Sequence, residues 1–167
     1  DPYQPVEGRY RLTRSILSLL LAFGTPCSVV TKNTMICRDL EILAGLAAGP
    51  GCAVYFSITT LDEELARLLE PDTPPPAKRL AAMEILAGRG VDVGVLIAPI
   101  IPGVTDSEEN LRTIVRQAAA HGARHVSGAP LRLQGSVRSV FVEFLSEQRP
   151  DLIPLYEWLY PGAHARI

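Results

Sequence analysis

The sequence is poor in the residue types that hold metals. It contains three cysteines and three histidines among 167 residues. Cys27, Cys37 and Cys52 lie far apart along the chain, without the CxxC or Cys/His spacing typical of a zinc or iron–sulfur site. An odd cysteine count without a secretory signal favours reduced thiols in the cytoplasm. We therefore predict that Cys27 and Cys52 are small core residues at the starts of strands, and that this chain binds no metal itself.

Long apolar runs and an excess of one charge are also missing. The longest apolar run, 16–23, is interrupted by Ser18 and is far shorter than the ~20 residues of a membrane span. A formal net charge of −2 and an aromatic content of 6% give no sign of a basic, base-stacking surface. The N-terminus, DPYQPVEGRYR, has no apolar signal-peptide core, and its lack of Met suggests a piece of a longer chain. The histidines, His121, His125 and His164, are scattered, and we expect no catalytic role for them.

The stretch 91–106, VDVGVLIAPIIPGVTD, combines a strand with a tight loop. Its first seven residues are rich in β-branched side chains and predict a strand that is buried on both faces. Pro99 and Pro102 end this strand because neither can donate to a sheet ladder, and Gly103 lets the backbone turn. In parallel α/β folds such a loop lies at the carboxyl ends of the strands, where ligands bind.

Helix starts are predicted from capping residues. Asp106 stands where the cap of a helix over 107–120 is expected, with a glutamate three residues later. Thr60 and Glu63 form a second such pattern before a short helix. The first helix is expected to turn an apolar face inward. That face consists of Leu12, Ile16, Leu19, Leu20 and Phe23.

Helices and strands are predicted to alternate along the chain. Such alternation indicates a parallel sheet with right-handed crossovers. Four strands do not close a barrel of about eight, and the chain opens on a loop that leads straight into a helix, as if a strand had been removed. We therefore predict a single domain over 1–167, an α/β fold that is the later part of a (β/α) barrel. The predicted strands are 27–32, 52–59, 91–97 and 124–133, and the predicted helices are 9–22, 38–48, 61–69, 76–87, 107–120, 136–148 and 151–160.

Polar residues at strand ends are the candidates for chemistry. Lys32 ends an apolar strand, where it can hold a carboxylate or phosphate, form a Schiff base, or simply extend to solvent. Ser57 and Thr59 share one face of the next strand with Tyr55, either to line a site for a polar ligand or to bond neighbouring backbone. The residues alone leave these alternatives open.

Four strings taken together resemble a known family. They are DPYQPVE, SVVTKN with RDLEIL, FSITTLDEELARLLEPDTPPPAKRL, and VGVLIAPIIPGVTD. In this order and spacing, the region 1–145 resembles radical S-adenosylmethionine (SAM) enzymes of the spore photoproduct lyase-like branch. The resemblance implies a partial, TIM-like (β/α)6 barrel in which the four strands present here are strands three to six. It also implies a [4Fe–4S] cluster held by a CxxxCxxC loop after the first strand, which this sequence lacks, so that the missing N-terminal part would carry the cluster.

The resemblance assigns roles to specific residues. Lys32 would pair with the methionyl carboxylate of SAM, and Ser57 would bond its polar part. Backbone around 98–103, after the predicted strand 91–97, would pack on adenine and ribose. The loop at the start of the chain would line the mouth of the pocket. The full set of expected cofactor-binding residues is Thr31, Lys32, Ser57, Pro102, Gly103, Asp1 and Tyr3.

The implied activity belongs to the full-length protein. It is the reductive cleavage of SAM to a 5′-deoxyadenosyl radical, which abstracts hydrogen from an unknown substrate in a lyase-like reaction. The resemblance implies the missing N-terminal part of the same enzyme as a partner, and it alone implies nucleic acid as a further partner; the present chain by itself is expected to be inactive. The expected cytoplasmic location rests on the cysteine usage and the lack of a secretory signal. Two alternatives are a barrel aldolase that uses Lys32 as a Schiff-base amine and a non-catalytic α/β interaction module.

Overall fold

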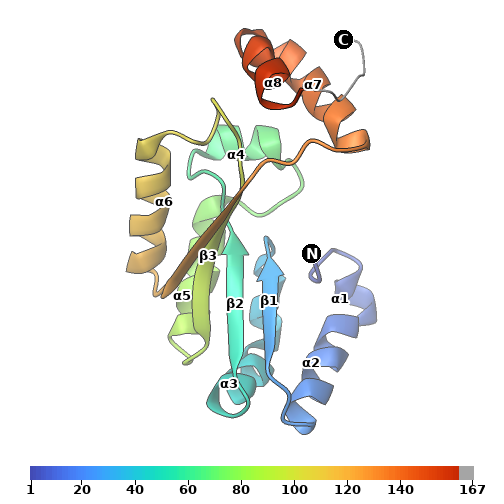
Figure 1. Ribbon diagram of the computed structural model, residues 1–167. Helices are drawn as coiled ribbons and strands as arrows, with labels where there is room; N and C mark the ends of the chain where they lie inside the picture. The colour runs from blue at the N-terminus through green and yellow to red at the C-terminus, as the bar shows by residue number, and fades with distance from the viewer. Residues whose placement is uncertain (162–167) are drawn as a thin grey trace. The chain divides into compact units, whose positions relative to one another are not determined.

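A computed structural model describes residues 1–161, which fall into two compact units. The first unit comprises Asp1–Ala129 and the second begins at Pro130. Whether these units belong to one barrel domain, as predicted for 1–167, stays a prediction. Figure 1 shows the elements and their labels.

The first unit is built on a four-stranded parallel sheet in sequence order, as predicted. Val29 lies beside Val54, and Val54 lies beside Val93, so that three neighbouring strands share one register. Valine is favoured at these positions because its branched side chain packs well on a pleated, buried surface. The strands are β1 (Cys27–Thr31), β2 (Cys52–Ser57), β3 (Asp92–Ile100) and β4 (His125–Pro130).

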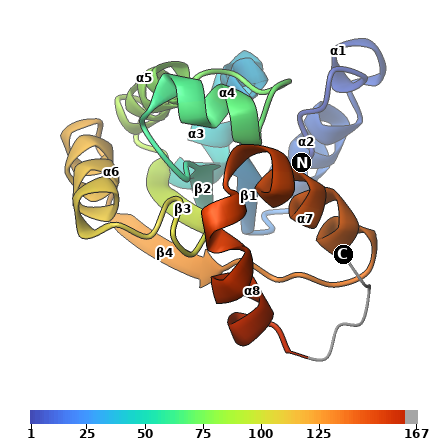
Figure 2. The same cartoon turned by 90° about the horizontal axis from the view of Figure 1, so that it is seen from above.

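Helices pack against one face of this sheet. Helix α3 contacts β2, and α5 contacts both β2 and β3; seen from above in Figure 2, α3 and α5 lie on the same side of the strands. Side chains alternate along each strand, so Val54 and Phe56 enter the core under these helices while Tyr55 points to the other face. The helices of this unit are α1 (Glu7–Tyr10), α2 (Leu12–Ala22), η1 (Thr34–Asp39), α3 (Leu40–Ala48), α4 (Glu63–Leu69), α5 (Pro76–Ala87) and α6 (Glu108–Ala120).

The predicted first helix is wrong in two respects. It is divided into α1 and α2 at Arg11, whose φ is 53°. Its expected inward face is largely exposed, because α2 packs on α3 through the opposite side, where Leu17 is buried and Leu21 lies against Gly45. Leu20 alone of the expected set packs against the core. We call the remaining exposed residues the α2 stripe, namely Leu12, Ile16, Leu19 and Phe23.

Both predicted helix caps are also displaced. Asp62, not Thr60, caps α4, since its carboxylate accepts hydrogen bonds from the N–H groups of Glu64 and Leu65 at 2.9 and 3.0 Å. Helix α6 is capped by Ser107, and Asp106 lies one residue before it. Short polar residues occur side by side at both helix starts, and local propensity does not distinguish between them.

The second unit is a small helical unit stabilised by aromatic contacts. Tyr156 lies 5.3 Å from Phe141 and 5.8 Å from Tyr160, measured between ring centroids. The hydroxyl of Tyr160 donates a hydrogen bond to the carbonyl of Leu131 at 2.6 Å, which ties the last helix to the start of the unit. The helices are α7 (Ser136–Gln148), η2 (Pro150–Leu152) and α8 (Ile153–Leu159).

Candidate functional site

Lys32 and Ser57 stand next to each other at the carboxyl ends of neighbouring strands. Thr31 is in register with Phe56, and each of the two candidate residues follows directly. Alternation places both on the sheet face opposite the helices. The Ser57 hydroxyl donates a hydrogen bond at 3.0 Å to the carbonyl of Ala98, at the end of β3. The structure therefore brings together the strand ends that the sequence pointed to.

The Lys32 ammonium is bonded to a carboxylate that the sequence interpretation missed. Its Nζ lies 2.7 Å from Oε1 of Glu70, the residue that directly follows α4. The other carboxylate oxygen, Oε2, lies 2.7 Å from a guanidinium nitrogen of Arg79 in α5. One carboxylate thus connects β1 to α5 and holds two cations.

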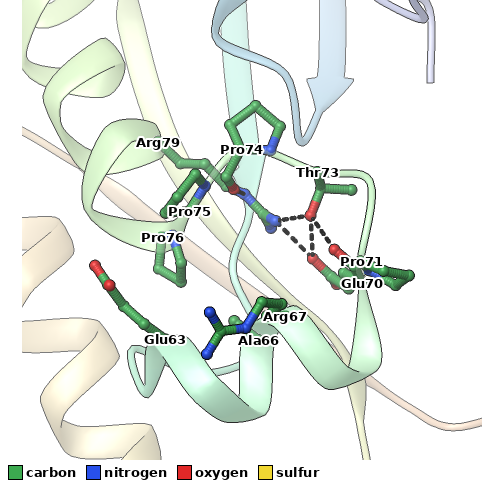
Figure 3. Close-up of a pocket in the computed structure, with 10 residues that line it drawn as sticks. All are labelled: Glu63, Ala66, Arg67, Glu70, Pro71, Thr73, Pro74, Pro75, Pro76 and Arg79. Carbon is green, nitrogen blue, oxygen red and sulfur yellow. Dashed lines mark hydrogen bonds and ion pairs between the residues drawn. The ribbon is translucent and has the colours of Figure 1, made fainter.

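Arg79 is buried and most of its donors are used. Its Nε donates to the carbonyl of Pro74 at 2.8 Å, and a terminal nitrogen donates to the carbonyl of Ser57, also at 2.8 Å. Figure 3 shows its remaining contacts with Glu70 and the Thr73 hydroxyl. Arg79 therefore fixes the end of β2 to the proline-rich connector between α4 and α5.

Electrostatics favour a charged Glu70. Burial alone would raise the pKa of this carboxyl group, but the hydrogen bond from Lys32 and the charge of Arg79 outweigh burial and leave the pKa below its ordinary value. The carboxylate is consequently ionised at neutral pH. Two cations against one anion leave the Lys32–Glu70–Arg79 group with a surplus positive charge, which suits an anionic part of a ligand.

Asp1 orders the end of β1. Its Oδ1 accepts hydrogen bonds from the Thr31 hydroxyl at 2.8 Å and from the N–H of Tyr3 at 2.9 Å. Its Oδ2 accepts from the N–H of Lys32 at 2.7 Å. Asp1 and Thr31 therefore hold the backbone from which the Lys32 side chain leaves the strand.

Tyr3 lies in the core beside Asp1. Its side chain is fully buried, and its hydroxyl donates to Oδ2 of Asp39 at 3.0 Å. Burial, reinforced by the Asp39 charge, raises the pKa of the Tyr3 phenol above its ordinary value. Arg38 and Arg14 also bond Asp39, which makes this network a tie between the first loop and η1. A ligand-binding role for Tyr3 stays a prediction.

The loop after β3 is closed by its own side chains. The Asp106 carboxylate accepts from the N–H of Gly103 at 2.9 Å, and the Thr105 hydroxyl accepts from the N–H of Ile101 at 2.8 Å. Gly103 has a φ of 73°, which only glycine adopts easily. The turn that carries Pro102 and Gly103 is thus built as predicted, although Asp106 closes the turn rather than the helix. The predicted strand end at Pro99 is wrong, because β3 continues through Pro99 to Ile100. Contact of this loop with adenine or ribose stays a prediction.

Glu70 and Arg79 also border a cavity of about 210 Å³ beside the connector. A sequence signal for Arg79 existed: it stands four residues before Met83 and seven before Leu86, both buried, so a charged residue occupies the apolar face of α5. The remaining lining residues are Glu63, Ala66, Arg67, Pro71, Thr73, Pro74, Pro75 and Pro76.

No cluster of His, Cys, Asp and Glu suited to a metal ion occurs within residues 1–161. Cys27 and Cys52 begin β1 and β2, as predicted, and their sulfur atoms lie 3.9 Å apart. Cys37 lies in η1, and His164 lies outside the described residues. No helix in the described part of the chain is long and apolar enough to cross a membrane.

Comparison with sequences gives one family and several longer relatives. The family described as the radical SAM superfamily matches residues 6–114. An uncharacterized protein of Mycobacterium tuberculosis is 41% identical over 160 residues, which cover 96% of this chain and 47% of the relative. An uncharacterized protein of Acidianus two-tailed virus is 33% identical over 138 residues, or 81% of this chain and 44% of the relative. The chain therefore spans about half the length of these curated relatives.

Solved structures share the fold at low sequence identity. A spore photoproduct lyase variant with bound AdoMet and dinucleoside spore photoproduct matches with a TM-score of 0.62 at 21% identity, over 86% of this chain and 43% of that protein. SuiB of Streptococcus suis bound to S-adenosylmethionine matches with a TM-score of 0.61 at 13% identity, over 84% of this chain and 35% of that protein. At these identities the likeness establishes the fold alone.

Proposed function

Because the chain belongs to the radical SAM superfamily, we propose that the full-length protein is a radical SAM enzyme of the spore photoproduct lyase-like branch. The observation that carries this proposal is the pair of neighbouring strand ends at which Lys32 and Ser57 stand, beside a group with surplus positive charge. When bound together with a reduced [4Fe–4S] cluster, SAM supplies a 5′-deoxyadenosyl radical that abstracts hydrogen from a substrate.

The residues present fit one part of SAM, its methionyl carboxylate. Lys32 offers donors of an ammonium that Glu70 holds at 2.7 Å, and a charge-assisted hydrogen bond to a carboxylate is stronger than a neutral one. Asp1 and Thr31 would keep the backbone of Lys32 in place, and the Ser57 hydroxyl would bond a neighbouring polar group of the ligand. Pro102 and Gly103 would present backbone to the adenosine part.

We further propose that a preceding segment of the full-length protein carries the cluster-binding loop and covers the open side of the sheet. Three features support this. The relatives are about twice as long as the chain, β1 is an edge strand, and the α2 stripe beside it is exposed. In this arrangement residues 1–167 alone bind no cluster and are inactive.

The reaction and the substrate class are proposed from similarity to known proteins, whereas the cofactor is also proposed from the residues of this chain. Lyase-like chemistry is proposed from the family resemblance, and a cytoplasmic location from the odd cysteine count without a secretory signal. The solved spore photoproduct lyase variant has a dinucleoside spore photoproduct bound. Nucleic acid is proposed as a substrate class on that likeness only. An aldolase reaction is disfavoured, since the amine of a Schiff-base lysine must react as the neutral base, whereas Lys32 forms an ion pair with Glu70.

The test uses the full-length protein, reconstituted with iron and sulfide under anaerobic conditions. With dithionite as reductant we expect SAM to be cleaved to methionine and 5′-deoxyadenosine, detected by liquid chromatography. Residues 1–167 treated in the same way should give neither an iron–sulfur absorption band nor products. Failure of the full-length protein to cleave SAM, or stoichiometric cluster binding by residues 1–167, would overturn the proposal.

A further inference from the structure

Among the described residues, Glu70 is the one side chain that links Lys32, after β1, to the buried Arg79 and through it to Ser57, at the end of β2. It bonds Lys32 directly, and through Arg79 it is linked to the carbonyl of Ser57. The exposed fractions fall steeply along this path, from 31% for the Lys32 side chain to 9% for Glu70 and 2% for Arg79. The accessible end of the group is therefore the lysine, and the buried end is the arginine.

The two cations differ in how many donors they have left. Arg79 spends its donors on Glu70, on Thr73 and on two backbone carbonyls, so it acts as an anchor (Figure 3). An ammonium has three N–H donors. Within residues 1–161, Glu70 takes one of those on Lys32, and two remain for a ligand.

The charge of Glu70 matters for a ligand that carries both signs. SAM has a carboxylate, an ammonium and a sulfonium, and its net charge is therefore positive. A site with two uncompensated cations would attract the carboxylate but repel the rest of the molecule. Glu70 cancels one of the two cations without removing the donors that Lys32 offers.

We propose that Glu70, anchored by Arg79, is a positioning residue that aims Lys32 at the carboxylate of the ligand and lowers the positive charge of the site so that a sulfonium is accepted. This inference rests on the proposed function, because SAM is the ligand that it concerns. It adds Glu70 and Arg79 to the site. They stand 38 and 47 positions after Lys32, and Glu70 contacts the lysine directly.

The experiment measures two dissociation constants in the reconstituted full-length protein, one for SAM and one for S-adenosylhomocysteine, which has the same carboxylate and ammonium but no sulfonium. For Glu70→Gln we expect SAM to bind roughly tenfold more weakly, and S-adenosylhomocysteine to be weakened less, so that the preference for SAM falls. Glu63→Gln is the matched control, because Glu63 begins α4, the helix that Glu70 directly follows, and points away from the pair in Figure 3. Both constants should stay within about twofold of wild type.

A double-mutant cycle separates positioning from general support of the fold. Glu70→Gln should weaken S-adenosylhomocysteine in the wild-type background and have no further effect in a Lys32→Met background, because no ammonium remains to be aimed. Equal weakening in both backgrounds would show that Glu70 only supports the fold. If Glu70→Gln does not fold, Glu70→Asp keeps the charge for Arg79 but withdraws it from Lys32, and should weaken both ligands by the same factor.

The outcomes distinguish this inference from the function on which it rests. If the wild-type protein binds neither ligand, the proposed function fails. If it binds both, and the Glu70 variants bind them with unchanged affinity and unchanged preference, the positioning role of Glu70 fails while the proposed function stands.

Discussion

Helices α2 and α5 distribute their side chains in opposite ways, and neither follows a simple amphipathic pattern. Helix α5 buries a charged residue, Arg79, whose side chain is 2% exposed. Helix α2 exposes apolar residues, with Leu12 at 64% and Leu19 at 57%. The difference lies in what stands opposite each helix. Arg79 meets a carboxylate and backbone carbonyls at the end of the sheet, whereas none of the elements described covers the α2 stripe.

The largest expected effect comes from the buried side of this comparison. Arg79→Ala leaves the buried Glu70 carboxylate with Lys32 as its remaining ionic partner, and leaves the Ser57 carbonyl without its hydrogen bond from Arg79. Removing one member of a buried ion pair costs roughly 3–5 kcal/mol. We expect a loss of that size in the unfolding free energy of the full-length protein, measured by denaturant titration.

Arg89→Ala provides the matched control. Arg89 forms an exposed ion pair with Glu41, with side-chain exposures of 46% and 78%. Surface pairs contribute about 0–1 kcal/mol, so this variant should unfold almost like wild type. Equal losses of unfolding free energy in Arg79→Ala and Arg89→Ala would mean that burial does not determine how much Arg79 stabilises the fold.

For the exposed α2 stripe, we expect a substitution to have different effects in residues 1–167 and in the full-length protein. Leu19→Ser should change the unfolding free energy of residues 1–167 by no more than about 0.5 kcal/mol, because Leu19 is already exposed. In the full-length protein the same change should cost ~1–3 kcal/mol if a preceding segment packs on the α2 stripe. Leu17→Ser, at a buried position of α2, should destabilise both proteins. A Leu19→Ser cost that is equally small in both would refute the covering segment.

A smaller effect is expected from pH. The pKa of Glu70 lies below its ordinary value of 4.5 in the folded protein. Its ion pairs therefore stabilise the fold fully above pH 4.5, and this contribution is lost as the pH falls through the lower folded pKa. Unfolding free energies measured between pH 7 and pH 3 should fall less steeply for Glu70→Gln than for wild type. Parallel curves would show that Glu70 titrates alike in the folded and unfolded states.

Local pattern was enough to predict the sheet. Runs such as CSVVT and CAVYFS identify strands, and their alternation with helices determines a parallel order. That order in turn placed Lys32 beside Ser57, since strand ends of a parallel sheet lie at one edge. The fold and the first members of the candidate site could therefore be derived from the sequence.

Long-range partners could not be derived in this way. Glu70 meets Lys32 across 38 positions, and the connector that brings it there has no periodicity. The exposed face of α2 was predicted as buried, because periodicity identifies an apolar face but not the element that covers it. The caps at Asp62 and Ser107 were missed because neighbouring residues cap equally well.

The central claim is that the ammonium of Lys32 recognises the carboxylate of SAM. The most direct measurement is a SAM titration of the reconstituted full-length protein, monitored by the spectrum of its cluster. Losing a charge-assisted hydrogen bond costs roughly 1.5–3 kcal/mol, so Lys32→Met should weaken SAM binding about ten- to a hundredfold and leave the spectrum without SAM intact. Lys78→Met, at an exposed position of α5, should bind like wild type. Wild-type affinity in a folded Lys32→Met protein would contradict the account.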